Sequence, residues 1–325
     1  MSFSKWNGGG EQPHQDRFNE MEHRNWELGY EVYDQGFGPL TQQTISTLLA
    51  IADFPPAHHH DDDNEGRLVR LLDVATGPGF VLSAAVDALS LDDAEQQQQQ
   101  TLIHLTGLDI SQNFLTLAEQ RIDAQLRQPQ QEQNANQINV DFVEGSAELL
   151  PFPENTFDSI VCNFGILHFF EPNTFLRESY RTLRPGGRIS FSAWAPPTRT
   201  QGFQIALSSI AEAGNPNVVD LPEGPNFFDF GDAQHATSTL QSIGFENVNS
   251  VELSDMKWSN MKNGAMLYEV LLNGTSRTRE ILLGQTPEET AAIQALMTKK
   301  YDLITDGGTT PLSMPAVVTS GQKPR

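Results

Sequence analysis

Short apolar runs alternate with longer amphipathic runs between residues 67 and 195, and this alternation constrains the fold more than any other feature. Helix-like runs lie at 80–90, 111–127 and 173–184, and the strand-like runs around them are RLVRLLDV, LIHLTGLDI, INVDFVEG, FDSIVCNF and GRISFSAW. Nearly continuous apolar strands in such an alternation predict a mostly parallel sheet with helices on both faces. The carboxyl ends of its strands then meet at one edge, where open α/β sheets bind their ligands.

The segments outside this alternation are expected to complete one domain. Residues 1–25 are polar and predict a flexible N-terminal arm, so the folded domain is predicted to span residues 26–325. Two late strand-like runs, NVNSVEL and PLSMPAVVTSG, are expected to join the same sheet. Residues 195–232 and 256–308 are expected to be excursions that cap the ligand edge.

The chain is strongly acidic, with a formal net charge of -22 and a pI near 4.6. Such a surface repels nucleic-acid backbones and anionic membranes. We therefore expect a small-molecule partner, and neither nucleic acid nor membrane insertion. The composition leaves the oligomeric state open.

The compartment is indicated by what the sequence lacks. Cys162 is the one cysteine, so no intramolecular disulfide can form, which fits a reducing compartment. No apolar run approaches the roughly 20 residues that a membrane helix needs. The N-terminal residues resemble neither a secretory nor a transit peptide. We expect a cytoplasmic protein.

A glycine turn follows the first strand-like run, in LLDVATGPGF. Gly77 and Gly79 allow the backbone to approach a ligand closely. A dinucleotide fingerprint would have a third glycine where Leu82 stands, and a phosphate-binding loop would have a Gly-Lys pair that is not present. The turn alone is therefore compatible with a structural role or with a ligand that has no pyrophosphate.

A carboxylate, Asp109, ends the second strand-like run. An acid at this place can accept two hydrogen bonds from a ribose diol. It could also cap the next helix, although Ser111 could take that role and leave Asp109 free.

The polar stretch PPAHHHDDDNEG, residues 55–66, contains histidines and aspartates that could bind a metal. Adjacent residues in a polar run rarely form a preformed site, so we interpret the stretch as a solvated loop and expect no metal. Two glutamine-rich stretches, at 95–100 and 127–137, are interpreted as loop insertions.

Four stretches in this order carry a family resemblance: LLDVATGPGF, LTGLDIS, FVEGSAELLPFPENTFDSIVCNFGILHF and ESYRTLRPGGRISFSAW. Over residues 68–195 the chain resembles the class I S-adenosylmethionine-dependent methyltransferases. Within them it is most similar to the small-molecule group that includes the ubiquinone and menaquinone C-methyltransferases, the methyltransferase type 11 group. The resemblance implies a Rossmann-like, seven-stranded sheet with a helical cap from the N-terminal and C-terminal segments.

The resemblance also implies the residues that bind S-adenosylmethionine and its product S-adenosylhomocysteine. Asp73, Gly77 and Gly79 would hold the methionine portion, and Asp109 the ribose. The full implied set is Tyr33, Asp73, Ala75, Gly77, Gly79, Asp109, Ile110, Ser146, Ala147, Glu148 and Asn163.

Two positions depart from the pattern of that family. Ala75 stands where the family often has glycine, so the turn is more crowded. Ser146 stands where the family often has aspartate, so adenine recognition is the least specified part of the site. Tyr33, with Tyr30 and Phe37, could attract the sulfonium through its ring, or could join a helix to the core.

Methyl transfer requires an acceptor aligned with the methyl group, and some acceptors must also lose a proton. His168, in NFGILHFF, follows the fourth strand-like run and is a candidate general base. The alternative interpretation is a loop histidine bonded to backbone.

The leading hypothesis is therefore transfer of a methyl group to an O, N, S or C atom of a small-molecule acceptor. The alternative is a catalytically silent member of the fold that binds the cofactor for regulation or interaction.

Overall fold

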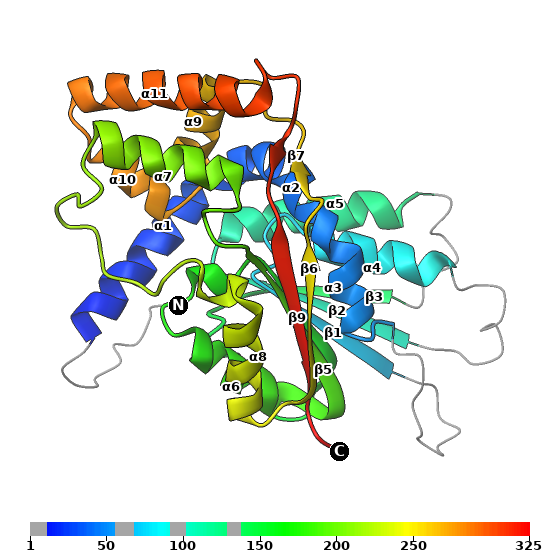
Figure 1. Cartoon of the computed structure of the whole chain (residues 1–325). Helices are drawn as coiled ribbons and strands as arrows, with labels where there is room; N and C mark the ends of the chain where they lie inside the picture. The colour runs from blue at the N-terminus through cyan, green and yellow to red at the C-terminus, as the bar shows by residue number, and fades with distance from the viewer. Residues whose placement is uncertain (1–11, 56–67, 92–101, 129–137) are drawn as a thin grey trace.

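The sheet forms the centre of the molecule (Figure 1). The computed structural model describes residues 12–55, 68–91, 102–128 and 138–325. Within these ranges seven strands form one sheet in the order β3-β2-β1-β4-β5-β9-β6. The strands are β1 (Leu68–Val74), β2 (Leu102–Asp109), β3 (Ile138–Glu144), β4 (Phe157–Asn163), β5 (Leu183–Trp194), β6 (Glu246–Leu253) and β9 (Ala316–Gln322).

All neighbouring pairs from β1 to β5 are parallel, and β9 runs antiparallel between β5 and β6. The expected Rossmann-like, mostly parallel sheet is confirmed. The two late strands β6 and β9 join this sheet, as expected. The last strand-like run is divided, however. Leu312–Ser313 (β8) pairs with Lys257–Trp258 (β7) in a separate two-stranded sheet, and β9 begins at Ala316.

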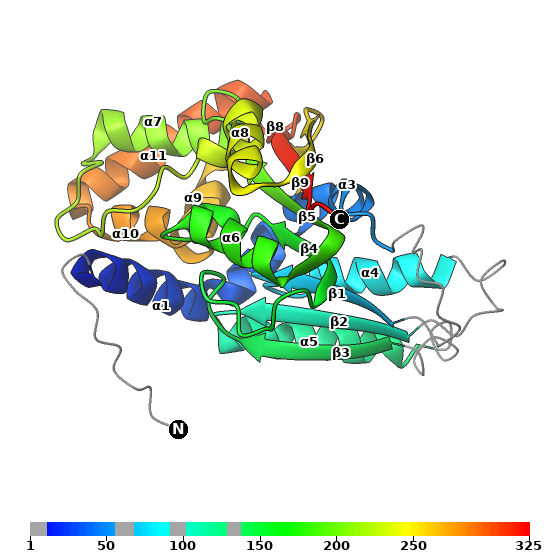
Figure 2. The same cartoon turned by 90° about the horizontal axis from the view of Figure 1, so that it is seen from below.

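Helices cover both faces of the sheet (Figure 2). On one face lie α3 (Ile45–Ile51), α4 (Phe80–Leu91) and α5 (Gln112–Leu126). On the other face lie α6 (Pro172–Thr182) and α8 (Ala233–Ile243). Short helical turns complete the connections: α2 (Gly38–Thr41), η1 (Gln42–Thr44), η3 (Ile166–His168) and η4 (Asp229–Gly231).

Successive strand residues belong to different cores because side chains alternate across a sheet. Leu71 and Val161 pack in the core beneath α3 and α4, whereas Leu72 and Ile160 pack in the core on the opposite face. All four side chains are fully buried. Burial on both faces explains why these strands appear as continuous apolar runs in the sequence.

A second group of helices gathers at one end of the molecule, together with α1 (Figure 1). It consists of α7 (Gln201–Ala213), α9 (Gly264–Asn273), α10 (Arg277–Leu283) and α11 (Pro287–Thr305). Helix α11 packs against α7 and α9, and α10 packs against α9. Thr286 begins α11 with a capping box closed by Glu289. The division of the chain into domain and cap stays a prediction, although these helices lie in the ranges expected for it.

The N-terminal prediction is wrong over residues 12–25, which belong to a long helix. Helix α1 runs from Gln12 to Gly36 and packs against α5 and α9. Its buried positions follow a helical period at Phe18, Met21, Glu22, Asn25, Trp26 and Gly29. Half of these residues are not hydrophobic, so the apolar periodicity that would reveal the helix is hidden. Residues 1–11 lie outside the described part of the chain.

Residues 56–66 of the polar stretch and most of the two glutamine-rich stretches also lie outside the described residues. In the ranges that the structure describes, no helix combines the length and apolarity needed to cross a membrane. The same ranges contain no cluster of three or more ligand-type side chains arranged for a metal ion.

Glu280 fixes the middle of α1 to α10. One carboxylate oxygen accepts from Asn25 at 2.8 Å and from Arg24 at 2.6 Å. Replacing Glu280 with Ala leaves the buried Asn25 amide without this acceptor, at a cost of about 1–3 kcal/mol. We expect the melting temperature to fall by several degrees in thermal denaturation. Glu119→Ala, at an exposed position on α5, is the control, and equal melting temperatures for the two variants would contradict the prediction.

Candidate functional site

A cavity of about 640 Å³ lies at the carboxyl ends of the strands, and its volume is within the range usual for ligand sites. Its walls come from α1, the ends of β1, β2, β3 and β4, and segments between residues 194 and 281. Ten of the residues singled out in the sequence line it: Tyr33, Ala75, Gly77, Asp109, Ile110, Ser146, Ala147, Glu148, Asn163 and His168. Asp73 and Gly79 lie behind this lining.

The two glycines of the first turn have different surroundings. Gly77 has a φ of +51°, and a Cβ built on it would meet no atom within 4 Å. Gly79 has a φ of +79°, and its Cβ would lie 2.8 Å from the Cβ of Ala118 on α5. Gly77 therefore keeps space open at the cavity, and Gly79 allows the turn to pack on α5. Ala75 also has a positive φ, +55°, which is strained for a residue with a side chain.

Asp109 joins the ends of β1 and β2. Its Oδ2 accepts from the Gly77 amide at 2.8 Å, and its Oδ1 accepts from the Ser111 amide at 2.9 Å. Ser111 caps α5 by accepting from Phe114, as one interpretation of the sequence had it. Burial raises the pKa of Asp109 to about 6, and the hydrogen bonds from these amides oppose the shift. A carboxylate has about four acceptor positions, so Asp109 can still accept from a ligand.

Asp73 is completely buried at the end of β1. Its Oδ2 accepts from the Thr76 hydroxyl at 2.6 Å, whereas its Oδ1 has no hydrogen-bond partner among the described residues. Burial raises the pKa of Asp73 to about 7, with a smaller contribution from the charge of Asp109. A buried oxygen without a donor is costly unless a ligand or water supplies one.

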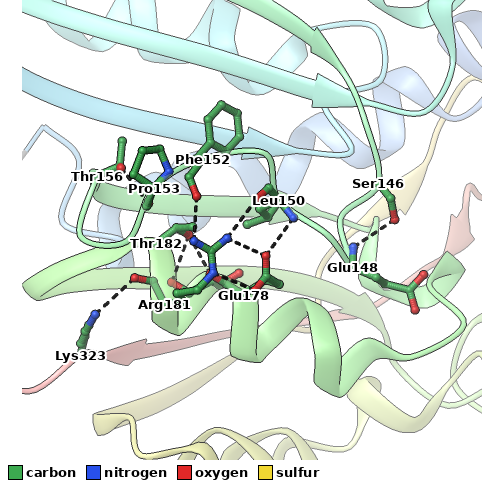
Figure 3. Close-up of polar contacts among 11 residues, drawn as sticks. Ser146, Glu148, Leu150, Phe152, Pro153, Thr156, Glu178, Arg181, Thr182 and Lys323 are labelled. Atoms are coloured by element: carbon green, nitrogen blue, oxygen red, sulfur yellow. Dashed lines mark hydrogen bonds and ion pairs between the residues drawn. The ribbon is translucent and has the colours of Figure 1, made fainter. Parts of the chain in front are cut away.

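The loop between β3 and β4 carries Ser146, Ala147 and Glu148. Ser146 Oγ accepts from the Glu148 amide within this loop at 3.2 Å (Figure 3). The Glu148 carboxylate accepts in turn from the Glu171 amide at the start of α6, and burial raises the pKa of Glu148. The Ser146 hydroxyl is thus already engaged in its own turn.

Arg181 of α6 holds the rest of this loop (Figure 3). It pairs with Glu178 in a bidentate arrangement and donates to the carbonyls of Leu150 and Phe152, at 3.0 and 2.7 Å. Glu178 accepts from the Leu150 amide at 3.0 Å. The Arg181 hydrogen bond lowers the pKa of Glu178. Arg181 belongs to the ESYRTLRPGG stretch, and its role as the support of the loop was not foreseen from the sequence.

Asn163 lies at the end of β4 with both amide atoms engaged. Its Oδ1 accepts from Thr44 and Ser192, each at 2.6 Å, and its Nδ2 donates to the Thr41 carbonyl at 3.1 Å. Asn163 therefore joins the segment after α1 to the sheet edge, while one side of it faces the cavity.

Aromatic rings from α1 and its neighbours form one wall. Tyr33 is stacked on Phe37 with centroids 5.6 Å apart, and Trp26 and Phe114 meet Tyr33 edge to face. Burial raises the pKa of Tyr33 to about 12, so its hydroxyl stays protonated at neutral pH. Of the three aromatic candidates on α1 and after it, Tyr33 and Phe37 line the cavity and Tyr30 does not.

A second aromatic group lines another part of the cavity. Phe203, Phe227 and Phe228 contact one another at centroid distances between 5.0 and 5.8 Å. Phe203 also meets Trp194, which stacks on Phe164 at 3.9 Å. Phe203, Phe227 and Phe228 come from a region that the sequence predicted only as a cap.

His168 lies between these walls. Its ring is 4.8 Å from that of Trp26 and 5.5 Å from that of Phe227, and its Nδ1 is 3.2 Å from Glu22 Oε2. Glu22 was missed because it belongs to the predicted arm, although it falls on the 3–4 spacing of the buried stripe of α1. Arg277 lines the cavity from the start of α10 and donates to the Pro222 carbonyl at 2.8 Å. Arg279 instead donates to the Leu272 carbonyl.

Comparisons with known proteins agree with this architecture. Residues 72–191 match the family model described as a methyltransferase domain. A demethylmenaquinone methyltransferase of Deinococcus radiodurans is 33% identical over 128 residues, which are 39% of this chain and 44% of that protein. A ubiquinone/menaquinone biosynthesis C-methyltransferase of Escherichia fergusonii is 46% identical over 59 residues, 18% of this chain and 24% of that protein. The matches thus span less than half the length of these relatives.

A phosphoethanolamine N-methyltransferase 2 of Haemonchus contortus, solved in complex with S-adenosyl-L-methionine, has a similar fold. The TM-score is 0.52 at 16% identity, over 95% of this chain and 60% of that one. The resemblance of this chain to the class I S-adenosylmethionine-dependent methyltransferases is therefore confirmed over residues 72–191, which match a methyltransferase domain. The sequence relatives that match over part of this region are ubiquinone and menaquinone C-methyltransferases.

The raised pKa of Asp73 predicts a pH dependence of stability. Between about pH 4 and pH 7 the folded protein keeps a proton on Asp73 that the unfolded chain has already released. The free energy of unfolding therefore falls as the pH rises through this window. Asp73→Asn removes this contribution while keeping an acceptor for Thr76.

We compare the melting temperature of Asp73→Asn with that of the unmodified protein at each pH. We expect the difference, variant minus unmodified protein, to be larger at pH 8 than at pH 5 by at least about 2 °C, which corresponds to roughly 1 kcal/mol in a large domain. Thermal denaturation at the two pH values measures it. Asp255→Asn, at an exposed position, should show no such difference. A pH-independent effect of Asp73→Asn would contradict the assignment.

Proposed function

We propose that this protein binds S-adenosylmethionine at the β1 and β2 end of the cavity and transfers its methyl group to a small-molecule acceptor at the aromatic end. The observation that carries the proposal is the continuity of the cavity. It connects Gly77 and Asp109 at the sheet edge with Phe203 and Phe227 among the later segments. The cofactor and the methyl acceptor can then lie within reach of each other in one cavity.

The residues at the sheet edge fit the cofactor. The Oδ1 of Asp73, which has no partner in the part of the chain that the structure describes, is an acceptor suited to an ammonium group, directly or through water. Gly77 leaves space beside it for the amino-acid portion. Asp109, with acceptor capacity remaining, suits a ribose diol.

Ile110, Ala147 and the loop around Ser146 and Glu148 lie beyond Asp109 and suit the adenine. Because the Ser146 hydroxyl is engaged with the Glu148 amide, adenine recognition in this proposal depends on backbone groups and apolar contact more than on that side chain. Asn163 supports the site by holding Thr41 and Thr44, and Tyr33 closes it from α1.

The bound cofactor supplies a methyl group on a sulfonium, a leaving group that needs no further activation. The protein must align the acceptor and exclude water. The aromatic rings of Trp26, Tyr33 and Phe37 line the cavity, and a ring face near the sulfonium attracts its charge by about 0.5–2 kcal/mol. His168 is the candidate for receiving a proton from the acceptor.

The acidic surface favours a small acceptor over a nucleic acid. A net charge of -22 opposes the approach of a phosphate backbone. An acceptor held between the rings of Phe203, Phe227 and Phe228 would be largely apolar in its body. Transfer itself can be tested without knowing the acceptor.

Titration calorimetry with S-adenosylmethionine and S-adenosylhomocysteine tests the first half of the proposal, and we expect saturable binding of both. Methyl-labelled S-adenosylmethionine with a metabolite extract tests the second half, and we expect a labelled small molecule that forms only when protein is present. Absence of cofactor binding would refute the proposal. Binding without transfer across broad extracts would favour the silent alternative.

The contrast between the two glycines predicts separable effects. Gly77→Ala places a methyl group in open space at the cavity, at a φ that costs about 1–2 kcal/mol. Gly79→Ala drives a methyl group against Ala118, and overpacking of this kind costs about 1–3 kcal/mol beyond a similar backbone strain.

We expect Gly77→Ala to weaken cofactor binding about tenfold or more in calorimetry, with a modest change in melting temperature. Gly79→Ala should lower the melting temperature further than Gly77→Ala does. Unchanged cofactor affinity in a folded Gly77→Ala protein would show that this edge of the cavity is not the cofactor site.

A further inference from the structure

The contact between Glu22 and His168 brings together two elements that are far apart in sequence. Glu22 lies on α1, and His168 ends the turn after β4. The Glu22 side chain is 4% exposed and that of His168 is 22% exposed. A carboxylate with so little access to water needs donors from the protein, because an unpaired buried charge is costly.

Glu22 Oε2 has two such donors within reach. The indole Nε1 of Trp26 donates to it at 2.8 Å, and His168 Nδ1 lies 3.2 Å away. The Trp26 ring also packs edge-on against the imidazole, at 4.8 Å and 86°. Trp26 thus contacts both the Glu22 carboxylate oxygen and the His168 imidazole.

A carboxylate beside Nδ1 keeps the imidazole proton on that nitrogen, because Nδ1–H can then donate to it. The lone pair is left on Nε2. Within the described residues, no hydrogen bond to His168 Nε2 is recorded, and the histidine lines the cavity. The 3.2 Å contact is an ion-pair contact and not an aligned hydrogen bond in this structure, and apo sites often hold such contacts poorly aligned until substrate binds.

We propose that Glu22 is a positioning residue that holds His168 as a proton acceptor, and that the acceptor substrate therefore bears a group, represented below by a hydroxyl, that loses its proton as methylation proceeds. This inference rests on the proposed methyl transfer. The inference goes beyond methyl transfer because it distinguishes between classes of acceptor. A thioether or a tertiary amine has no proton to lose and would not need the Glu22–His168 pair.

The step balances as follows. The O–H bond of the acceptor breaks, and its proton binds to His168 Nε2. The electron pair released on the acceptor forms the new bond to the methyl carbon, and the sulfonium S–C electron pair returns to sulfur. The imidazolium beside Glu22 is the charge that the buried carboxylate stabilises.

The other titratable or charged groups facing the same cavity come from several elements. Tyr33 and His23 lie on α1, Asp109 ends β2, Glu148 lies in the β3–β4 loop, and Arg277 begins α10. Burial lowers the pKa of Arg277, and the charge of Glu22 opposes this shift. A pH profile must therefore be compared between matched variants and not interpreted alone.

Nitrogen NMR of the His168 ring in the unmodified protein tests the tautomer directly. We expect a protonated Nδ1 and an unprotonated Nε2 above the histidine titration. In Glu22→Gln, which is nearly isosteric and keeps an acceptor for Trp26, we expect the ring proton to redistribute between Nδ1 and Nε2, because the anion that favours a proton on Nδ1 is gone. A proton on Nε2 in the unmodified protein, or an unchanged tautomer in the variant, would overturn the proposal.

Transfer of labelled methyl from S-adenosylmethionine to the metabolite extract, measured from pH 5.5 to 9, tests the consequence. We expect Glu22→Gln to lower the rate about 10- to 100-fold and to shift the acid limb of the profile to lower pH, with cofactor affinity in calorimetry unchanged. Glu20→Gln, an exposed position on the same helix, is the control and should match the unmodified protein.

The outcomes separate the two proposals. Loss of cofactor binding in the unmodified protein would end the proposed function while leaving the NMR result standing. Transfer by Glu22→Gln at the unmodified rate and pH profile would end the role of Glu22 alone. If Glu22→Gln fails to fold, the tautomer in the unmodified protein and the profile of Glu22→Asp, which keeps the charge on a shorter side chain, decide the question.

Discussion

The hydrogen bonds of Asp109 are the constraint on which the site depends. Through Gly77 and Ser111, one carboxylate fixes the turn after β1 relative to the start of α5. The glycine must adopt a positive φ to present its amide to that carboxylate, and α5 must begin where Ser111 caps it. The cavity edge is therefore set by backbone groups that the fold already holds in place, and a ligand that uses Asp109 meets a preorganised acceptor.

Helix α1 contributes in a different way, because its buried stripe is chemically mixed. Phe18, Met21 and Trp26 supply packing, whereas Glu22 and Asn25 place polar atoms in regions from which water is largely excluded. Asn25 is used for docking on Glu280, and Glu22 faces His168. A helix that served only to cover the sheet edge would be more stable with apolar residues at these places. Glu22 and Asn25 are better explained by their contacts with His168 and Glu280.

The parallel strands, the helices between them and the glycine turn could be predicted because their signals are local. Leu71 and Leu72 are apolar on both faces of a buried strand, and Gly77 and Asp109 follow strands at the expected edge. Helix α1 could not be predicted by the same reasoning, since Glu22, Asn25 and Gly29 interrupt its apolar period. The pairing of Glu22 with His168 depends on α1 meeting the turn after β4, and no local pattern records such a tertiary contact. The supporting role of Arg181 was hidden for the same reason.

The two ends of the cavity also differ in how much of their lining lies within the segment that is similar to known proteins. The residues suited to the cofactor, from Asp73 to Asn163, lie almost entirely within the segment that matches the methyltransferase domain, residues 72–191. The residues around the acceptor end lie mostly outside it: Glu22 and Trp26 precede the match, and Phe203, Phe227 and Arg277 follow it. Similarity in the matched segment therefore supports the cofactor more strongly than any particular acceptor. The chemistry of the acceptor has to be argued from the side chains of this chain, and among them the buried carboxylate beside an imidazole is the most specific.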